Sequence, residues 1–136
     1  MRLIVDTNVL FSALIKDSVT RRILMHIEAE LITIAFSEQE MLNHKKMLLQ
    51  KSSLNEIEFG LLLEKLKSKL VFIDDRIIAE KFEEAYEIMK KIDPQDSPFI
   101  AAALATGSDI WSDDAHFDKQ QKVKIWKTKD LVKFLL

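Results

Sequence analysis

The sequence predicts an α/β fold, in which a short, mainly parallel sheet of four to five strands forms the middle of a three-layer α/β/α sandwich. Short apolar runs rich in β-branched residues recur along the chain, and helical patterns separate them. Strands of this kind that alternate with helices are typical of a parallel sheet covered on both faces. The length of 136 residues suits one domain with its own core, so we expect a single domain over residues 1–136.

The first half of the chain predicts two strands and four helices. Residues 3–5 are an apolar run, and Thr7 or Asn8 can cap the helix that follows. Ser37 with Glu40 three residues later matches a capping box, so a helix is expected to begin at Ser37. The other elements expected here are a helix over 19–28, a strand over 31–36, a continuation of the capped helix toward residue 50, and a helix over 54–66.

The second half of the chain predicts three more strands. A strand over 70–73 precedes a helix over 78–92, which the segment 93–98 with its two prolines interrupts. Residues 99–106 are apolar nearly all round, which indicates a buried helix, and Gly107 suits the end of that helix. The remaining elements expected are a strand over 109–112, a last strand over 124–126 and a helix over 128–135.

The composition excludes several classes of function. Two glycines are too few for a dinucleotide-binding loop, a phosphate-binding loop or a nucleophile elbow. The absence of cysteine excludes thiolate zinc sites, thiol nucleophiles and disulfides, which suits a reducing cytoplasm. The net charge of −2 means that any contact with nucleic acid depends on a local basic patch. No apolar stretch approaches the roughly 18 residues that span a bilayer, so we expect a cytoplasmic protein without a membrane segment.

Four acidic residues occupy positions that a solvated surface does not explain. Asp6 directly follows the first strand, and Asp114 follows the strand over 109–112. Asp96 lies at the start of the buried helix, and Glu40 lies in the first turn of the helix after the second strand. Right-handed crossovers bring the carboxyl ends of parallel strands to one edge of a sheet, where open α/β sheets bind ligands. We therefore expect these carboxylates to meet there.

For three of these four acids, a second acidic residue nearby could be the site residue instead. Each of the three could also simply cap a helix. Asp93 or Asp96 can cap the buried helix. Glu40 can act only as the partner of Ser37 in the capping box. The competing pairs, which the sequence leaves open, are Asp93 and Asp96, Glu38 and Glu40, and Asp113 and Asp114.

A cluster of carboxylates at one edge predicts a bound cation. Two like charges about 5 Å apart at an effective dielectric constant near 20 repel by about 3 kcal/mol, so such a cluster persists when a cation neutralises it. An all-oxygen set of ligands selects hard ions such as Mg²⁺ or Mn²⁺ over zinc. A hard divalent ion with open water positions activates water and stabilises a departing oxyanion, which is the chemistry of phosphoryl transfer.

Four segments of the chain resemble the sequence blocks of PIN-domain ribonucleases. These are LIVDTNVLFSAL, FSEQEML, DPQDSPFIAAAL and DIWSDDAHF, which occur in the order of the family and span the whole chain. The resemblance implies a three-layer α/β/α domain that binds Mg²⁺ or Mn²⁺ and cuts RNA, most simply single-stranded RNA. Many small prokaryotic members resemble the toxins of VapBC pairs, so the resemblance also implies an antitoxin partner and a homodimer.

The resemblance assigns roles to individual residues. The four acids of the family, which bind the metal and carry catalysis, fall on Asp6, Glu40, Asp96 and Asp114. Asn8 and Ser112 match small polar positions that orient carboxylates or water, and Asp93 matches an additional acid. One departure is His116, because the family often has a second Asp or Asn at this place. His116 can assist a phosphate or a water molecule, or lie on the surface.

Basic residues near these acids are the candidates for contact with RNA. One group follows the first helix and is expected to flank the acidic edge, and a second lies one turn beyond Glu40. Lysine suits non-specific contact with phosphate, so the groups predict binding without sequence selection. The candidates are Lys16, Arg21, Arg22, Lys45 and Lys46.

The function predicted is therefore a Mg²⁺- or Mn²⁺-dependent ribonuclease in which activated water attacks a phosphodiester. A non-catalytic PIN-like scaffold is the main alternative. A haloacid-dehalogenase-type phosphatase requires a second Asp two residues after the first, and Asn8 occupies that place. A response-regulator receiver requires strict alternation of strands and helices, which the two consecutive helices between Ser37 and Leu66 contradict.

Overall fold

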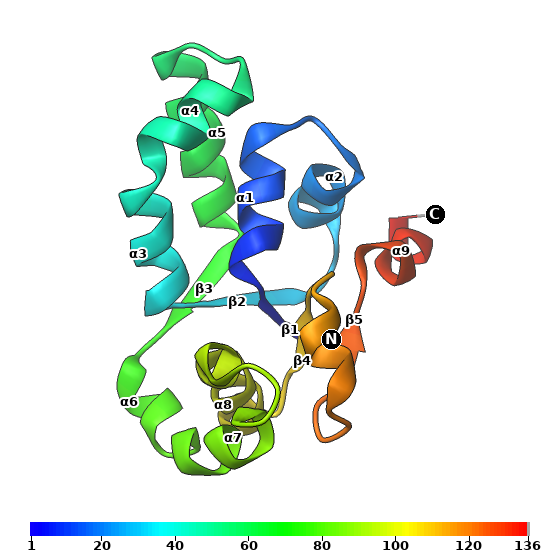
Figure 1. Ribbon diagram of the computed structural model, residues 1–136. Coiled ribbons are helices and arrows are strands. Elements are labelled where there is room, and N and C mark those ends of the chain that lie inside the picture. The colour runs from blue at the N-terminus through cyan, green and yellow to red at the C-terminus, as the bar shows by residue number, and fades with distance from the viewer. Residues whose placement is uncertain (136) are drawn as a thin grey trace.

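The computed structural model of the protein describes residues 1–135; Leu136, the last residue of the predicted domain, lies outside the described residues. A parallel sheet of five strands runs through the middle, in the order β3-β2-β1-β4-β5. Helices cover both of its faces (Figure 1). The strands are β1 (Arg2–Val5), β2 (Glu30–Ile34), β3 (Leu70–Ile73), β4 (Asp109–Trp111) and β5 (Ile125–Trp126).

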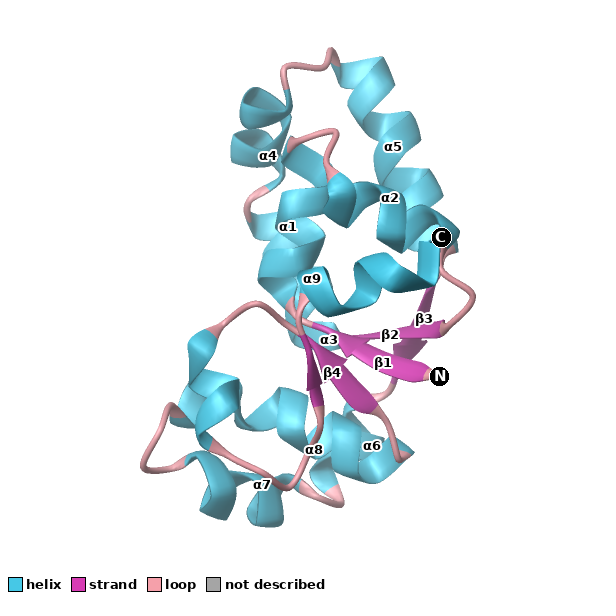
Figure 2. Ribbon diagram, turned by 90° about the vertical axis from the view of Figure 1, so that its right-hand side faces the viewer, coloured by secondary structure: helices cyan, strands magenta, loops and turns pink. Residues whose placement is uncertain are grey.

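The two layers of helices come from different parts of the chain, as Figures 1 and 2 show. The first layer contains α1 (Thr7–Ile15), α2 (Val19–His26), α3 (Ala35–Asn43), α4 (Lys45–Ser52), α5 (Glu56–Ser68) and α9 (Thr128–Leu131). The second contains α6 (Asp75–Ala79), α7 (Phe82–Met89) and α8 (Ser97–Thr106). Three short 3₁₀ helices are η1 (Pro94–Asp96), η2 (Ala115–Lys119) and η3 (Val132–Leu135). None of the helices in the described residues is both long and apolar enough to cross a membrane.

Alternate residues of the strands bury their side chains in different layers. Leu3 and Val5 pack into the core beneath α1, whereas Ile4 packs into the core that α8 covers. All three are fully buried. Because side chains alternate across a strand and both faces of this sheet are covered, apolar residues follow one another without alternation in the central strands, as in Leu3, Ile4 and Val5. The predicted α/β class with three layers is confirmed.

The order of the strands places a switch point between β1 and β4. The chain builds β2 and β3 on one side of β1 and then returns to add β4 and β5 on the other. β1 pairs with β4 in parallel, with Val5 opposite Trp111, and the N–H of Asp6 donates a hydrogen bond to the carbonyl of Trp111 (3.0 Å). Open α/β sheets bind ligands in the crevice at such a point, beyond the carboxyl ends of the strands.

Helix α8 is the buried helix that the sequence predicts. Its apolar residues include Phe99, Ile100 and three consecutive alanines over 101–103, all of them buried. Small side chains let the helix backbone lie close to the sheet. Gly107 ends the helix in the left-handed conformation, with φ of 64°, which glycine adopts without the strain that a Cβ brings.

Two of the expected helices differ from the sequence prediction. The capping box at Ser37 is wrong, because β2 ends at Ile34 and α3 already begins at Ala35. The helix expected over 37–50 is two helices, which His44 separates. The helix expected over 78–92 is also two helices, α6 and α7, and Asp74 caps the first of them. No proline or glycine marks either break.

The earlier start of α3 gives Ser37 a different role. Its side chain is fully buried, and its hydroxyl shares a hydrogen bond of 2.7 Å with the hydroxyl of Thr7. Thr7 begins α1, so this bond joins the first turns of α1 and α3. Asp6 directly precedes α1 and Glu40 lies on α3, so the hydroxyl pair fixes the position of one acid relative to the other.

Removing one hydroxyl of this pair is expected to destabilise the fold more than removing both. Thr7→Val or Ser37→Ala alone leaves the other hydroxyl buried without a partner, which costs about 1–3 kcal/mol. The double variant Thr7→Val/Ser37→Ala removes both polar groups and should recover part of that loss. Urea unfolding in EDTA at pH 7 measures all four proteins. Strictly additive losses would show that the two hydroxyls do not depend on each other.

Candidate active site

Asp6 lies at the carboxyl end of β1 and is nearly inaccessible to solvent, with 6% of its surface exposed. Its Oδ2 accepts a hydrogen bond of 2.7 Å from the hydroxyl of Ser112, which is fully buried just beyond β4. Burial is the main cause of the raised pKa of Asp6; the bond from Ser112 opposes this rise, and the charge of Asp114 adds to it. Asp6 is thus an acid that the fold holds in place at an electrostatic cost.

Asp114 is joined to Asp6 through Ser112. The N–H of Asp114 donates to the hydroxyl oxygen of Ser112 (3.0 Å), and Oδ1 of Asp114 accepts from the N–H of His116 (2.9 Å). The Asp114 side chain therefore caps η2 and is fixed at the edge of the sheet. Ser112, which the resemblance assigns as a supporting polar residue, holds both acids in one arrangement.

The structure gives Asp113 and Asp114 different roles. Both carboxylate oxygens of Asp113 accept hydrogen bonds from Thr128: Oδ1 from its N–H (2.8 Å) and Oδ2 from its hydroxyl (2.6 Å). Asp113 and Asp114 both border a hollow of about 250 Å³ beside Asp6, but Asp113 uses its oxygens to hold the start of α9. Asp114 is the acid that the fold leaves available.

Asp93 and Asp96 also have different roles in the structure. Oδ1 of Asp93 accepts from the N–H of Gln95 (3.1 Å), which makes Asp93 the cap of η1. Asp96 makes no capping bond to α8, and its buried Oδ2 has no hydrogen-bond partner. The pKa of Asp96 is raised to about 6. Desolvation is the largest cause, the charges of Asp93, Asp114 and Asp6 also raise it, and His116 acts against the rise.

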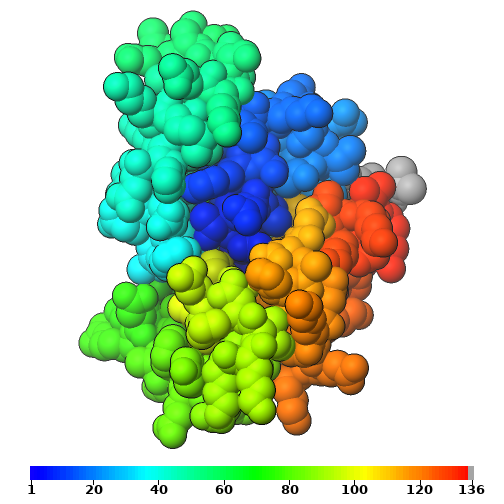
Figure 3. All heavy atoms as spheres, viewed as in Figure 1, coloured from blue at the N-terminus to red at the C-terminus, as the bar shows by residue number. Residues whose placement is uncertain are grey.

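The four predicted acids line one cleft of about 340 Å³. Glu40 reaches it from α3, where its Oε2 lies 3.0 Å from Nε2 of His44, while Glu38 does not line it. In Figure 3 the dark blue start of α1 lies between cyan α3, the yellow-green segment before α8 and orange η2. The cleft is lined by Asp6, Thr7, Asn8, Phe11, Phe36, Glu40, Gln95, Asp96, Phe99 and Asp114.

His116 faces the acids from η2. Its Nδ1 lies 3.3 Å from Oδ2 of Asp93, 3.5 Å from Oδ1 of Asp114 and 3.8 Å from Oδ2 of Asp96. Asp93, Asp96 and His116 each offer one ligand atom to a group in which all these atoms lie within 4.8 Å of one another. His116, where the resemblance implies an Asp or Asn, therefore lies beside Asp96 and Asp114 of the candidate site.

The expected basic residues do not border this cleft. Arg21 donates from Nε to the carbonyl of Ala13 (2.7 Å) at the far end of α1 from Asp6, so it has a structural role there, and Lys16 follows that same end. Arg22 is exposed on α2. Lys45 and Lys46 line a separate hollow of about 640 Å³ between α3, α4 and α5. Their contact with RNA stays a prediction, and Lys16, Arg21 and Arg22, which were expected to flank the acidic edge, do not line the cleft.

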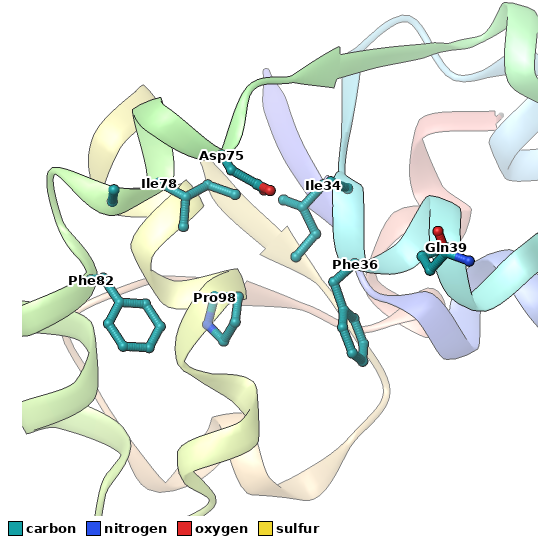
Figure 4. A pocket seen from close by; sticks show the side chains of 9 residues that line it. Ile34, Phe36, Gln39, Asp75, Ile78, Phe82 and Pro98 are labelled. Carbon is teal, nitrogen blue, oxygen red and sulfur yellow. The ribbon is translucent and has the colours of Figure 1, made fainter.

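A further hollow, which the sequence does not predict, adjoins the cleft. It has a volume of about 770 Å³, and Figure 4 shows Phe36 and Phe82 on either side of it with Pro98 between them. Phe36 lines both the hollow and the acidic cleft, and half of its surface is exposed. Periodicity does not reveal this surface, because its residues come from β2, α3, α6, α7 and α8.

The chain matches one protein-family model, and its fold is similar to those of solved structures. A family model described as PIN domain matches residues 4–135. The fold is similar to a chain of VapBC2 from Rickettsia felis, in a structure bound to a DNA fragment from their promoter, with a TM-score of 0.71, 13% identity, and coverage of 93% of this chain and 98% of that chain. It is also similar to a chain of FitAB bound to the IR36 DNA fragment, with a TM-score of 0.60, 17% identity, and coverage of 94% and 95%. No curated protein matches the chain.

The raised pKa of Asp96 predicts how the stability of the metal-free protein depends on pH. The unfolded chain ionises Asp96 near 3.8 and the folded protein near 6, so stability falls as pH rises through this interval, by about 3 kcal/mol at most. Asp96→Asn removes this penalty, so the variant should be more stable than the parent at pH 7 and lose the advantage below about pH 4. Thermal melts in EDTA across this range measure the difference, with Asp17→Asn as an exposed control.

Metal should act in the opposite direction in the same melts. Mg²⁺ at ten times its dissociation constant should stabilise the parent by about 1.4 kcal/mol and Asp96→Asn by less. If Asp96→Asn is less stable than the parent in EDTA and responds to metal as the parent does, Asp96 is a structural residue and no ligand.

Proposed function

The chain belongs to the PIN-domain family, and we propose that it is a Mg²⁺- or Mn²⁺-dependent ribonuclease that hydrolyses RNA phosphodiester bonds as a single domain. The observation that carries this proposal is the convergence of Asp6, Glu40, Asp96 and Asp114 in one cleft at the switch point of the sheet. These acids lie up to 108 residues apart in the sequence, counted from Asp6 to Asp114. Their common use is to bind a cation.

The kinds of side chain in the cleft suit such an ion. Among the described residues, the group whose ligand atoms lie within 4.8 Å of one another is Asp93, Asp96 and His116, which shares Asp96 with the four acids. The donor set is four carboxylates, which suits a hard ion. Oδ2 of Asp96 is buried without a hydrogen-bond partner, and an unpaired buried carboxylate oxygen is costly unless a cation reaches it. The ion would be held by Asp6, Glu40, Asp96 and Asp114, and when bound it would activate water and stabilise the departing oxyanion.

The other residues of the site position these carboxylates. The Ser112 hydroxyl holds Asp6, and the N–H of His116 holds Asp114. Asn8 is exposed at the rim and presents an amide that can orient water or a phosphate oxygen. The proposed hydrolysis needs no side chain as nucleophile, because the ion would supply activated water. The preferred substrate we propose is single-stranded RNA, since it leaves the phosphodiester accessible to a cleft on the surface.

We also propose that an antitoxin partner controls this activity and that the protein works as a homodimer in the cytoplasm. The protein partner is suggested by the two structures of similar fold, because the names VapBC2 and FitAB each denote a pair of proteins. The apolar hollow next to the cleft is a surface whose exposed Phe36 and Phe82 a bound protein would cover. Homodimer formation and localisation rest on the family resemblance and the composition.

Asp6→Asn is expected to abolish RNA cleavage while the fold remains intact. The amide keeps the volume of the side chain and removes its charge, and a loss of this kind of electrostatic stabilisation costs about 10²-fold or more in rate. The matched control is Asp17→Asn, which makes the same substitution just beyond the other end of α1. Cleavage of a labelled single-stranded RNA with and without Mn²⁺ measures both proteins.

This cleavage assay and a phosphatase assay distinguish the nuclease from a non-catalytic scaffold and from a phosphatase. A scaffold would bind RNA or a partner without metal-dependent cleavage by the parent. A phosphatase would instead hydrolyse para-nitrophenyl phosphate, although Asn8 replaces the acid that this reaction needs. An Asp6→Asn protein that keeps a tenth of the parent rate would remove Asp6 from the catalytic set.

Glu40→Gln and Glu38→Gln form a matched pair on α3. The two residues point about 200° apart on a helix, and only Glu40 lines the cleft. Glu40→Gln should weaken Mn²⁺ binding by about tenfold or more and reduce cleavage with it, whereas Glu38→Gln should change neither. Isothermal titration with Mn²⁺ and the cleavage assay give the two readouts. The reverse result would show that Glu38, and not Glu40, is the acid of the site.

A further inference from the structure

Lysine is concentrated in the last part of the chain. Residues 119–135 contain six lysines and a single acid, so this segment carries a net charge of +5, whereas the whole chain carries −2. Five of the six lysines are exposed, and Lys127 is half-buried. We call the surface of this segment the lysine surface, and its lysines are Lys119, Lys122, Lys124, Lys127, Lys129 and Lys133.

The positive charge of the lysine surface is largely unpaired. Nζ of Lys127 lies 2.8 Å from Oδ2 of Asp118, and within residues 1–135 no ion pair joins the other five lysines to an acid. Asp130, the one acid of the segment, accepts a hydrogen bond from the N–H of Lys127 at the start of α9 (3.0 Å). The exposed lysines are therefore available to an anion from outside the molecule.

The backbone that carries these lysines is fixed by a buried amide. Nε2 of Gln120 donates to the carbonyls of Phe117 and Val123, both at 2.9 Å. Its Oε1 accepts from the N–H of Lys122 (3.0 Å) and from that of Val123 (2.9 Å). Lys124 then leads into β5, which pairs with β4. A ligand thus meets lysines on an ordered backbone, which lowers the entropy lost on binding.

Aromatic rings lie among the lysines. Nζ of Lys124 lies 4.1 Å from the centre of the Trp126 ring, and Nζ of Lys133 lies 5.5 Å from it, so cation–π attraction holds both over the ring. Phe134 packs edge-to-face on Trp126 with centroids 5.6 Å apart, and 46% of its surface is exposed. Lysines beside an exposed aromatic ring are typical of surfaces that bind single-stranded nucleic acid.

The lysine surface begins close to the acidic cleft. η2 follows Asp114 and ends at Lys119, and five residues of 3₁₀ helix at a rise of about 2 Å each span about 10 Å. In Figure 3 the orange surface of η2, beside the cleft, continues into the red surface of β5, α9 and η3. None of the described residues that line the cleft is a lysine or an arginine. The cations nearest along the chain from Asp114 are therefore those of the lysine surface.

We propose that the lysine surface binds the phosphate backbone of single-stranded RNA and leads the strand to the acidic cleft. The proposal takes the proposed ribonuclease as its premise and adds the surface on which the substrate lies. Lysines that neutralise phosphates release counterions, which supplies the affinity, and they do not read the bases. Binding on this surface is therefore independent of base sequence and weakens as salt is added.

A direct test is fluorescence anisotropy with a labelled oligouridine of about 12 nucleotides, in EDTA so that the RNA stays intact. Lys119→Gln/Lys122→Gln/Lys124→Gln should weaken binding to the full chain by about tenfold or more. The plot of log K against log salt concentration should also lose about 2 from its slope, because each phosphate contact on a single strand contributes about 0.7. The corresponding triple substitution to arginine keeps the charges and should keep the affinity.

The matched control removes the same amount of charge elsewhere. Lys51→Gln/Lys65→Gln/Lys69→Gln changes three exposed lysines on and after α4 and α5, and it should leave binding close to that of the parent. An equal loss of affinity in both triple variants would show that net charge, and not the lysine surface, attracts the RNA, and would overturn the proposal. Circular dichroism confirms that both variants keep the helix content of the parent.

The outcomes also distinguish this proposal from the proposed function. If the parent cleaves RNA with Mn²⁺ while the variant at Lys119, Lys122 and Lys124 binds oligouridine as the parent does, the lysine surface is refuted and the nuclease remains. If that variant loses binding but the parent does not cleave RNA, the surface stands and the nuclease is refuted. If the parent does not bind oligouridine, the lysine surface is refuted whatever the cleavage assay shows.

Discussion

The pairing of β1 with β4 is the constraint on which the candidate site depends. The two strands come from opposite ends of the chain, and their parallel register places Val5 opposite Trp111. The N–H of Asp6 continues the pairing to the carbonyl of Trp111, and the hydroxyl of Ser112 then reaches the carboxylate of Asp6. A shift of one residue would turn Asp6 or Ser112 to the other face of the sheet. Backbone hydrogen bonds in the core therefore fix the geometry of the acids.

The acids that this pairing gathers are costly to the fold without a cation. Asp6 and Asp96 both have raised pKa values, with desolvation as the largest cause and neighbouring acids as a further one. The hydrogen bond from Ser112 to Asp6 relieves part of this cost. Oδ2 of Asp96 has no hydrogen-bond partner, so no such bond relieves its burial. Sites that carry out chemistry often keep such local instability, because the groups that would remove it would also remove the function.

The sequence predicts the sheet, the buried helix and the place of the acids, because these follow from local apolar runs and from the rule that parallel strands end at one edge. The choice between Asp113 and Asp114 is different, because the partner that occupies Asp113 is Thr128, fifteen residues away. The role of Ser37 is hidden for the same reason, since its hydroxyl pairs with Thr7. Patterns in one segment of sequence do not show which distant segment meets it.

The site thus consists of a part fixed by the sheet and a part carried by short helical turns. Asp6 and Ser112 follow directly from the strands, whereas Asp93, Asp96 and His116 lie on η1 and η2, which the packing of Phe117 on Phe99 holds against α8. A substitution on η2 can therefore change the donor atoms beside the acids without altering the register of the sheet. His116 on η2, for example, brings an imidazole nitrogen to 3.5 Å from Oδ1 of Asp114. The strands therefore fix the positions of Asp6 and Ser112, and the turns fix which side chains face them.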